Sequence, residues 1–91
     1  MSELIRSHTI VNEKGLHARA SARLVETVEG FEADATVRKD GLDAAGDSIM
    51  GLLMLAASKG TTIEVETSGP AAADLADALE NLIADKFGEE D

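Results

Sequence analysis

The chain has 91 residues, no cysteine and a formal net charge of −10 at pH 7, which allows one domain and excludes disulfides and thiolate metal sites. The negative charge argues against nucleic acid and anionic membrane surfaces as partners, because both recruit clustered Lys and Arg. No apolar run approaches the ~20 residues of a membrane span, and the first residues lack the apolar segment of a signal peptide, so we expect a cytoplasmic protein.

The first third of the chain predicts a strand, a loop and a helix. Residues 4–11 are rich in Ile, Val, Thr and Ser, as strands are, although either alternate set of side chains could face the core. After a loop at 12–15 the pattern becomes helical from Ala18. Gly30 is expected to end this helix, since glycine adopts the left-handed conformation without a Cβ penalty.

Three further strands are predicted. Residues 33–39 and 42–45 flank Asp40-Gly41, a strong signal for a two-residue hairpin turn. Residues 61–67 alternate Thr, Ile, Val and Glu, which is typical of a strand with one wet face.

Two more helices are predicted from residues that typically begin or end a helix. Asp47 and Ser48 offer an N-cap for a helix over residues 49–58, which Gly60 is expected to close. Pro70 lies near the first position of a third helix, and residues 88–91 are expected to form a frayed acidic tail. The apolar stripe of the third helix is Leu75, Ala76, Leu79, Leu82 and Ile83.

The predicted order is strand, helix, strand, strand, helix, strand, helix. Such a chain forms an α+β domain, and residues 1–91 have no linker long enough to divide them. We therefore expect an open-faced sandwich, in which three helices cover one face of a four-stranded antiparallel sheet.

The segment Gly15-Leu16-His17-Ala18-Arg19 carries the clearest chemical signal. Histidine is a nitrogen nucleophile whose charge changes near neutral pH. A helix N-terminus presents unpaired backbone N–H groups that hold an anion, and arginine adds a planar fork that fits phosphate. These residues therefore favour a histidine that carries a phosphoryl group.

The same segment resembles the active-site signature of HPr, the histidine-containing phosphocarrier family of the bacterial phosphotransferase system. A second block, Ser48-Ile49-Met50-Gly51-Leu52-Leu53, resembles the HPr segment around its regulatory serine. The separation of the two blocks and the order of the elements also fit, so the resemblance covers nearly the whole chain.

The resemblance implies a stoichiometric carrier rather than a turnover enzyme, and no cofactor or metal. His17 would accept a phosphoryl group from enzyme I through Nδ1 and pass it to an EIIA-type protein. Arg19 and the backbone N–H groups of Ala18 and Arg19 would contact the phosphate. We expect a monomer.

Two alternatives stay open at this point. One is a regulatory binding module of a nitrogen-related phosphotransferase branch, in which phosphorylation of His17 controls a partner protein. The other is a small α+β domain that binds an anion without a covalent step.

Ser48 has two interpretations. Its position is explained by helix capping alone. The resemblance adds phosphorylation by an HPr kinase/phosphatase, which would place charge on a docking surface, although Asp47 stands where many relatives have a basic or neutral residue.

The helix after Ser48 is apolar nearly all round, although a helix on a sheet needs only one apolar stripe. By resemblance to the family's docking surface, Ile49, Met50 and Leu53 are predicted to be exposed and to contact partners. The alternative is a fully buried helix.

Two other positions bear on these expectations. Ala20 stands where most HPr sequences have proline, and we expect phosphoryl transfer to survive because the histidine and the arginine are intact. His8 lies in the first strand without a partner at metal-ligand spacing and is interpreted as structural.

Overall fold

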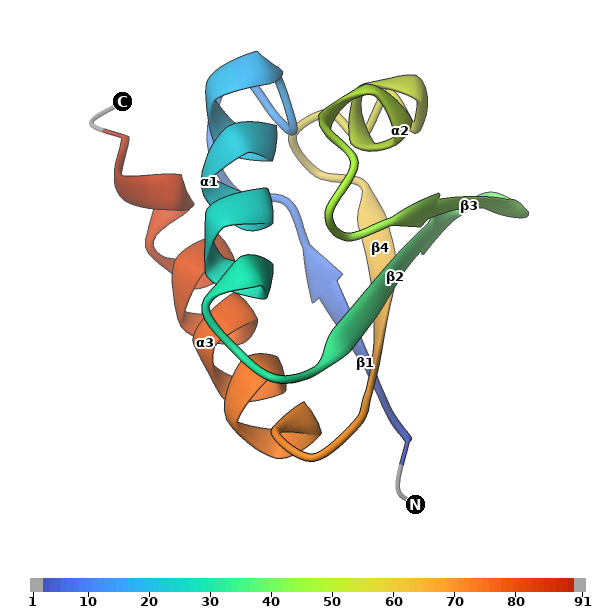
Figure 1. The fold of residues 1–91 in the computed structure, drawn as a ribbon. Helices are drawn as coiled ribbons and strands as arrows, with labels where there is room; N and C mark the ends of the chain where they lie inside the picture. The colour runs from blue at the N-terminus through green and yellow to red at the C-terminus, as the bar shows by residue number, and fades with distance from the viewer. Residues whose placement is uncertain (1–2, 90–91) are drawn as a thin grey trace.

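The structure is a computed structural model that describes residues 3–89. Four strands form one antiparallel sheet in the order β1-β4-β2-β3, and the helices lie against one of its faces (Figure 1). This is the α+β open-faced sandwich that the sequence predicts. Its elements are β1 (Leu4–Thr9), α1 (Ala18–Glu29), β2 (Asp34–Lys39), β3 (Leu42–Ala45), α2 (Ile49–Met54), β4 (Thr62–Ser68), α3 (Ala72–Ala84) and the short 3-10 turn η1 (Lys86–Gly88).

The alternation of side chains along the strands separates the core from the open face of the sheet. In β1 the even-numbered residues from Leu4 to Ile10 face the helices and the odd-numbered ones are exposed, which resolves the phase that the sequence left open. In β4 the buried residues are Ile63, Val65 and Thr67. The Thr67 hydroxyl donates a hydrogen bond to the Ala72 carbonyl (3.0 Å), so this polar side chain is buried with a partner.

The hairpin between β2 and β3 has the predicted turn. Asp40 and Gly41 both have positive φ, at 51° and 83°, as a two-residue turn of the type I′ family requires. The strand pair then continues in register from Lys39 opposite Leu42 to Thr36 opposite Ala45.

Two helix ends differ from expectation. Gly30 ends α1 as predicted, but with φ −81° rather than in the left-handed region. The helix α2 ends at Met54 instead of residue 58, and Gly60 lies in the turn before β4. The reason is tertiary: Ala56 turns the chain with φ 52°, and the Ala57 carbonyl accepts a hydrogen bond from the Leu16 amide (2.8 Å).

The start of α3 also differs slightly. Ala71 is its N-cap and makes no side-chain capping bond, so Pro70 precedes the helix instead of occupying its first position. None of the helices within residues 3–89 has the length and apolar character needed to cross a lipid bilayer.

The end of the chain is packed rather than loose as far as the structure describes it. Phe87 is completely buried although its φ is 56°, and the Arg23 guanidinium of α1 donates to the Phe87 carbonyl. Gly88 and Glu89, which were expected to belong to a frayed tail, therefore follow an anchored turn. Residues 90 and 91 lie outside the described residues.

Candidate functional site

His17 is the N-cap of α1. Its backbone is extended (φ −80°, ψ −173°), and its carbonyl accepts the first helical bond from the Ser21 amide (2.8 Å). The side chain is 27% exposed, so the ring is neither buried nor fully in solvent. The sequence prediction that this histidine lies at a helix start is confirmed.

The tight loop between β1 and α1 positions His17 at the helix start. The Gly15 amide donates to the Asn12 carbonyl (3.2 Å), and Gly15 has φ 65°, a conformation that favours glycine. A Cβ at Gly15 would lie 2.5 Å from the Ala57 carbonyl oxygen, so the loop packs backbone against backbone on the segment that follows α2. Both the conformation and the close approach require glycine here.

The two ring nitrogens of His17 have different partners. Nδ1 accepts a hydrogen bond from the backbone N–H of Arg19 (3.3 Å), at the start of α1. Nε2 contacts the carboxylate of Glu89, whose other oxygen accepts from the Asn12 side-chain amide (3.0 Å). No local sequence pattern indicates Glu89, because it is 72 positions from His17 in the chain. Asn12 is close to His17 in sequence, but it belongs to a loop and its burial is set by the folded structure.

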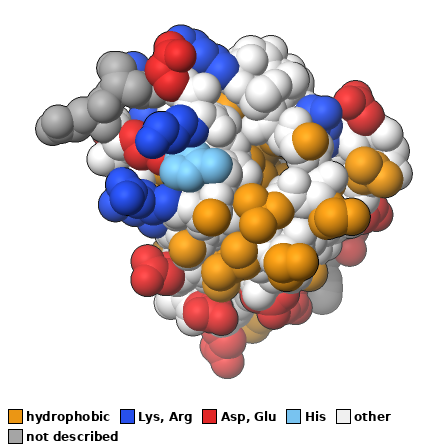
Figure 2. All heavy atoms as spheres, turned by 90° about the horizontal axis from the view of Figure 1, so that it is seen from above, with side chains coloured by type: hydrophobic (Ala, Val, Ile, Leu, Met, Phe, Trp, Pro, Cys, Tyr) orange, Lys and Arg blue, Asp and Glu red, His pale blue; other side chains and the backbone are white. Residues whose placement is uncertain are grey.

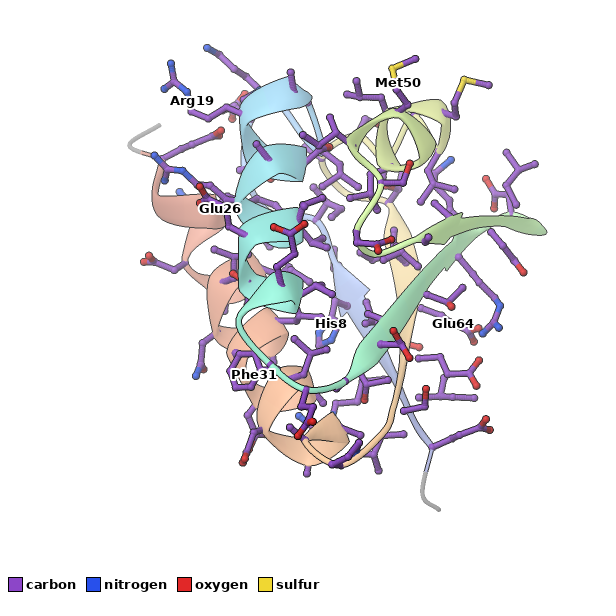
Figure 3. The ribbon with its side chains drawn as sticks, viewed as in Figure 1. His8, Arg19, Glu26, Phe31, Met50 and Glu64 are labelled. Atoms are coloured by element: carbon purple, nitrogen blue, oxygen red, sulfur yellow. The ribbon has the colours of Figure 1, made fainter. Side chains whose placement is uncertain are left out.

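Cationic side chains border the same site. Lys14 and His17 line one shallow depression, together with Leu53 from α2. Arg19 is exposed and projects from the first turn of α1, and its guanidinium makes no ion pair within residues 3–89 (Figure 3). In Figure 2 cationic side chains lie on one side of the exposed histidine and apolar side chains gather on the other.

Ser48 is the N-cap of α2, as predicted. Its Oγ accepts a hydrogen bond from the Gly51 amide (3.0 Å), and its backbone is extended. Capping therefore accounts for this serine, and its phosphorylation stays a prediction.

Apolar side chains of α2 form an exposed patch beside the histidine. Met50 and Met54 are 71% and 74% exposed, and the predicted residues Ile49 and Leu53 are exposed as well. Leu52 alone is buried among the helical residues, so the alternative of a fully buried α2 is wrong. We call Ile49, Met50, Leu53 and Met54 the α2 patch.

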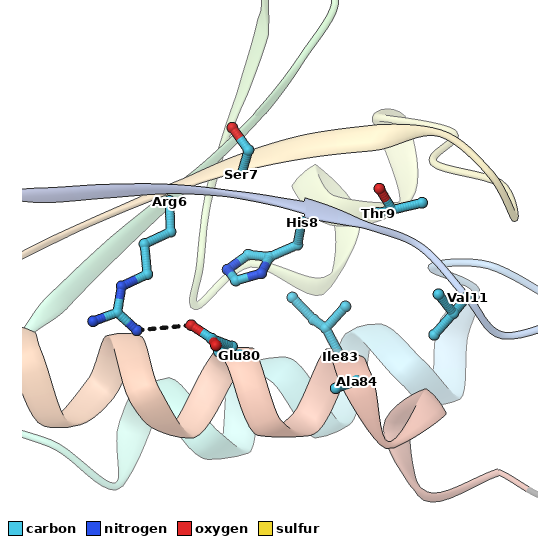
Figure 4. Close-up of a pocket in the computed structure, with 8 residues that line it drawn as sticks. All are labelled: Arg6, Ser7, His8, Thr9, Val11, Glu80, Ile83 and Ala84. Atoms are coloured by element: carbon cyan, nitrogen blue, oxygen red, sulfur yellow. Dashed lines mark hydrogen bonds and ion pairs between the residues drawn. The ribbon is translucent and has the colours of Figure 1, made fainter.

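His8 belongs to a different surface. It lies on the inner side of β1 in a pocket that Arg6, Glu80 and Ile83 help to line (Figure 4). Burial is the main cause that lowers the pKa of His8, and Arg6 acts in the same direction while Glu80 opposes it.

Comparison with known proteins decides the family. The family model described as "PTS HPr component phosphorylation site" matches residues 5–85. The chain belongs to the HPr family. An HPr phosphocarrier of Cupriavidus necator is 45% identical over 86 residues, which cover 94% of this chain and 97% of that protein. An HPr structure from Thermoanaerobacter tengcongensis has a TM-score of 0.89 at 37% identity and covers 99% of both chains.

A phosphocarrier with a different name also matches. The Escherichia coli phosphocarrier named NPr is 45% identical over 62 residues, which cover 67% of this chain and 69% of that protein. The HPr resemblance seen in the sequence is therefore confirmed, and the phosphocarrier class of the chain follows from its family.

Proposed function

We propose that this HPr-family chain accepts a phosphoryl group on His17 from enzyme I and passes it to an EIIA-type protein. The observation that carries the proposal is a partly exposed imidazole at the N-cap of α1, with an Nδ1 lone pair directed at the helix start. The chain acts stoichiometrically: in each cycle it accepts one phosphoryl group and gives up one, without converting a substrate of its own.

The transfer step needs an unprotonated ring nitrogen. The Nδ1 lone pair of His17 forms the new bond to phosphorus as the donor's bond to phosphorus breaks, and the reverse exchange with the acceptor restores the free ring. In this proposal a phosphoryl oxygen of the product is held by the Arg19 N–H that now donates to Nδ1, and by the N–H of Ala18 at the same helix start.

The strength of that anion site suits reversible transfer. A helix N-terminus stabilises an anion by about 0.3–1 kcal/mol, and up to ~2 in a sheltered position. The exposed Arg19 guanidinium adds a mobile contact of the kind that fits phosphate. These contributions orient the phosphoryl group without making its release slow.

Partner docking is assigned to Ile49, Met50 and Leu53 of the α2 patch. Leu53 lines the depression that contains His17, and Ile49 and Met50 are exposed on the same short helix, so we expect a protein that covers the patch to reach the ring. Methionine packs against surfaces of different shape, which suits a carrier that must bind a donor and an acceptor in turn.

A second candidate is the nitrogen-related branch, in which the phosphorylation state of His17 controls a partner. The similarity to NPr favours it. The two roles use the same His17 chemistry and differ in the acceptor.

One experiment tests the phosphocarrier role and distinguishes the two candidate acceptors. The purified chain is incubated with enzyme I and labelled phosphoenolpyruvate, and we expect label on His17 that is acid-labile and base-stable. Loaded protein is then mixed separately with a sugar-type and a nitrogen-type EIIA, and the faster acceptor identifies the branch. An unlabelled wild-type chain would leave only the anion-binding alternative.

A regulatory phosphate on Ser48 is a separate proposal. It requires a kinase that accepts Asp47 as the preceding residue, and it would modify the Oγ that now accepts the capping hydrogen bond from the Gly51 amide. Incubation with an HPr kinase and mass determination of the product tests it, with Ser48→Ala as the control.

A further inference from the structure

The carboxylate of Glu89 links the end of the chain to His17. One of its oxygens contacts Nε2 of the ring, and the other accepts a hydrogen bond from the Asn12 side-chain amide (3.0 Å). The Glu89 side chain is only 12% exposed. This carboxylate is thus mostly withdrawn from solvent and directed at the imidazole that the proposed function uses.

The contacts of the ring agree on one tautomer. A neutral imidazole has a proton on one nitrogen and a lone pair on the other. A carboxylate only accepts, so the nitrogen that faces Glu89 must donate, which puts the proton on Nε2. At the other nitrogen the Arg19 N–H is the donor, so Nδ1 supplies the lone pair (3.3 Å). Two independent contacts therefore select the tautomer with Nδ1 free to react.

Asn12 fixes the position of Glu89. It is completely buried, and its amide nitrogen donates to the Gly15 carbonyl (2.8 Å) as well as to Glu89. If the Asn12 amide were flipped, its oxygen would face the Gly15 carbonyl and the Glu89 carboxylate, and neither of these groups can donate a hydrogen bond to it. The loop that carries His17 and the carboxylate behind it thus share one buried side chain.

The segment before Glu89 is also held in place. Phe87 is completely buried in the core, and its carbonyl accepts from the Arg23 guanidinium of α1. Gly88, with φ 77°, lies against that guanidinium, so that a Cβ there would collide with Arg23. Glu89 therefore extends from an anchored turn and does not depend on a loose chain end to reach His17.

We propose that Glu89 is a positioning residue that holds His17 in the Nε2-protonated tautomer for phosphoryl transfer; this role rests on the proposed function. During loading, the Nδ1 lone pair forms the bond to phosphorus, the donor's bond to phosphorus breaks, and the Nε2 proton stays in place. The ring gains positive charge in that step, which the carboxylate offsets. In the other tautomer Nδ1 would first have to lose its proton.

The tautomer can be measured without any partner protein. Two-bond proton–nitrogen correlation spectra of the His17 ring, recorded where the ring is neutral, distinguish a protonated Nε2 from a protonated Nδ1. We expect the wild-type chain to show the Nε2–H form, and Glu89→Gln and Glu89→Ala to move toward the mixture found in free histidine. Glu64→Gln is the matched control, since Glu64 is exposed on the sheet face away from α1 and α3 (Figure 3).

The rate of loading by enzyme I gives the second measurement. Glu89→Gln should lower the maximal rate about tenfold, the lower end of the effect of removing a partner that orients a reactive histidine. The KM for the carrier should stay the same, because Glu89 is not in the α2 patch. Glu64→Gln should change neither quantity. Glu89→Gln keeps the shape of the side chain, so it remains informative if Glu89→Ala loosens the turn.

The outcomes separate the two proposals. A changed tautomer together with a slower maximal rate supports the role of Glu89. An unchanged tautomer, or an unchanged rate despite a changed tautomer, overturns it while leaving the carrier function intact. A wild-type chain that takes no label overturns the proposed function itself, whichever tautomer it shows.

Discussion

The two histidines of this chain lie in opposite kinds of surroundings. His8 is on the inner side of β1, above α3, where burial lowers its pKa and where Arg6 and Glu80 pair with each other beside it. His17 is at the start of α1, partly exposed, with a backbone N–H at one nitrogen and a carboxylate at the other. The same side chain therefore lines a pocket in one place and, in the other, caps a helix with one ring nitrogen directed at the helix start.

If His17 is the phosphoryl acceptor that we propose, the difference indicates what a reactive histidine needs beyond exposure. The fold must leave one ring nitrogen with a directed lone pair, supply donors for the group it receives, and keep the ring proton on the other nitrogen. At His17 these come from the start of α1 and from Glu89, whereas the pocket around His8 combines Arg6 with Glu80, Ile83 and neighbouring residues.

Exchanging each histidine for glutamine tests this contrast most directly. His17→Gln should abolish labelling by enzyme I and phosphoenolpyruvate, because the amide has no nitrogen lone pair that can form the bond to phosphorus. His8→Gln should be labelled at a rate within about twofold of wild type, since His8 lies on a different surface. Label retained in His17→Gln would show that the acceptor is another residue.

The glycine that shapes the His17 loop gives the next largest effect. Gly15→Ala puts a methyl group against the Ala57 carbonyl at a φ of 65°, so the free energy of unfolding should fall by at least about 2 kcal/mol. Labelling should slow at least about tenfold as the N-cap shifts.

Gly41→Ala is the control for that change. Gly41 has φ 83°, and a Cβ at this position would have nothing within 4 Å, so only the backbone cost of about 1 kcal/mol applies. Urea unfolding and labelling rates check both variants. Equal losses of stability in the two variants would mean that the contact with Ala57 contributes nothing.

Restoring the family's usual proline in the first turn of α1 should matter less. Ala20→Pro removes an amide near the helix start, where the first N–H groups lack helical partners, so labelling should stay within about threefold of wild type. Ala20 is completely buried, so its thermal unfolding should be followed in parallel. A loss above about a hundredfold would show that this turn depends on alanine.

The pH dependence of stability should show a small contribution from His8. Its folded pKa lies below the ordinary value of about 6.5, so between the two the unfolded chain binds a proton that the folded chain does not. The free energy of unfolding therefore falls as pH is lowered through this range and is unaffected by His8 above it. The stability difference between wild type and His8→Gln should change with pH below about 6.5. A constant difference would contradict the shift.

Local signals were enough for much of the fold. The Asp40-Gly41 turn, the cap at Ser48 and the start of α1 depend on neighbouring residues, and all three are where the sequence predicts them. The sequence predicts the end of α2 at residue 58 because residues 55–57 continue the apolar pattern. The structure ends the helix at Met54, since the Ala57 carbonyl accepts a hydrogen bond from the Leu16 amide instead of continuing the helix.

The candidate site could be predicted only in part for a similar reason. His17 and its helix start form a contiguous motif, and the exposed α2 patch follows from an excess of apolar residues. Glu89 belongs to an acidic end of the chain, which in sequence alone indicates a solvated tail. Its contact with a ring 72 positions away arises from the burial of Phe87 and Asn12, which only the assembled core determines.

The bond between the Leu16 amide and the Ala57 carbonyl has a consequence for recognition. It joins the loop that carries His17 to the segment that follows α2, the helix on which we expect partners to dock. Gly15 also packs closely against Ala57, so the His17 loop and the segment after α2 are held together by two contacts. If partners bind the α2 patch as we propose, each of them would meet the His17 ring at the same position relative to the helix.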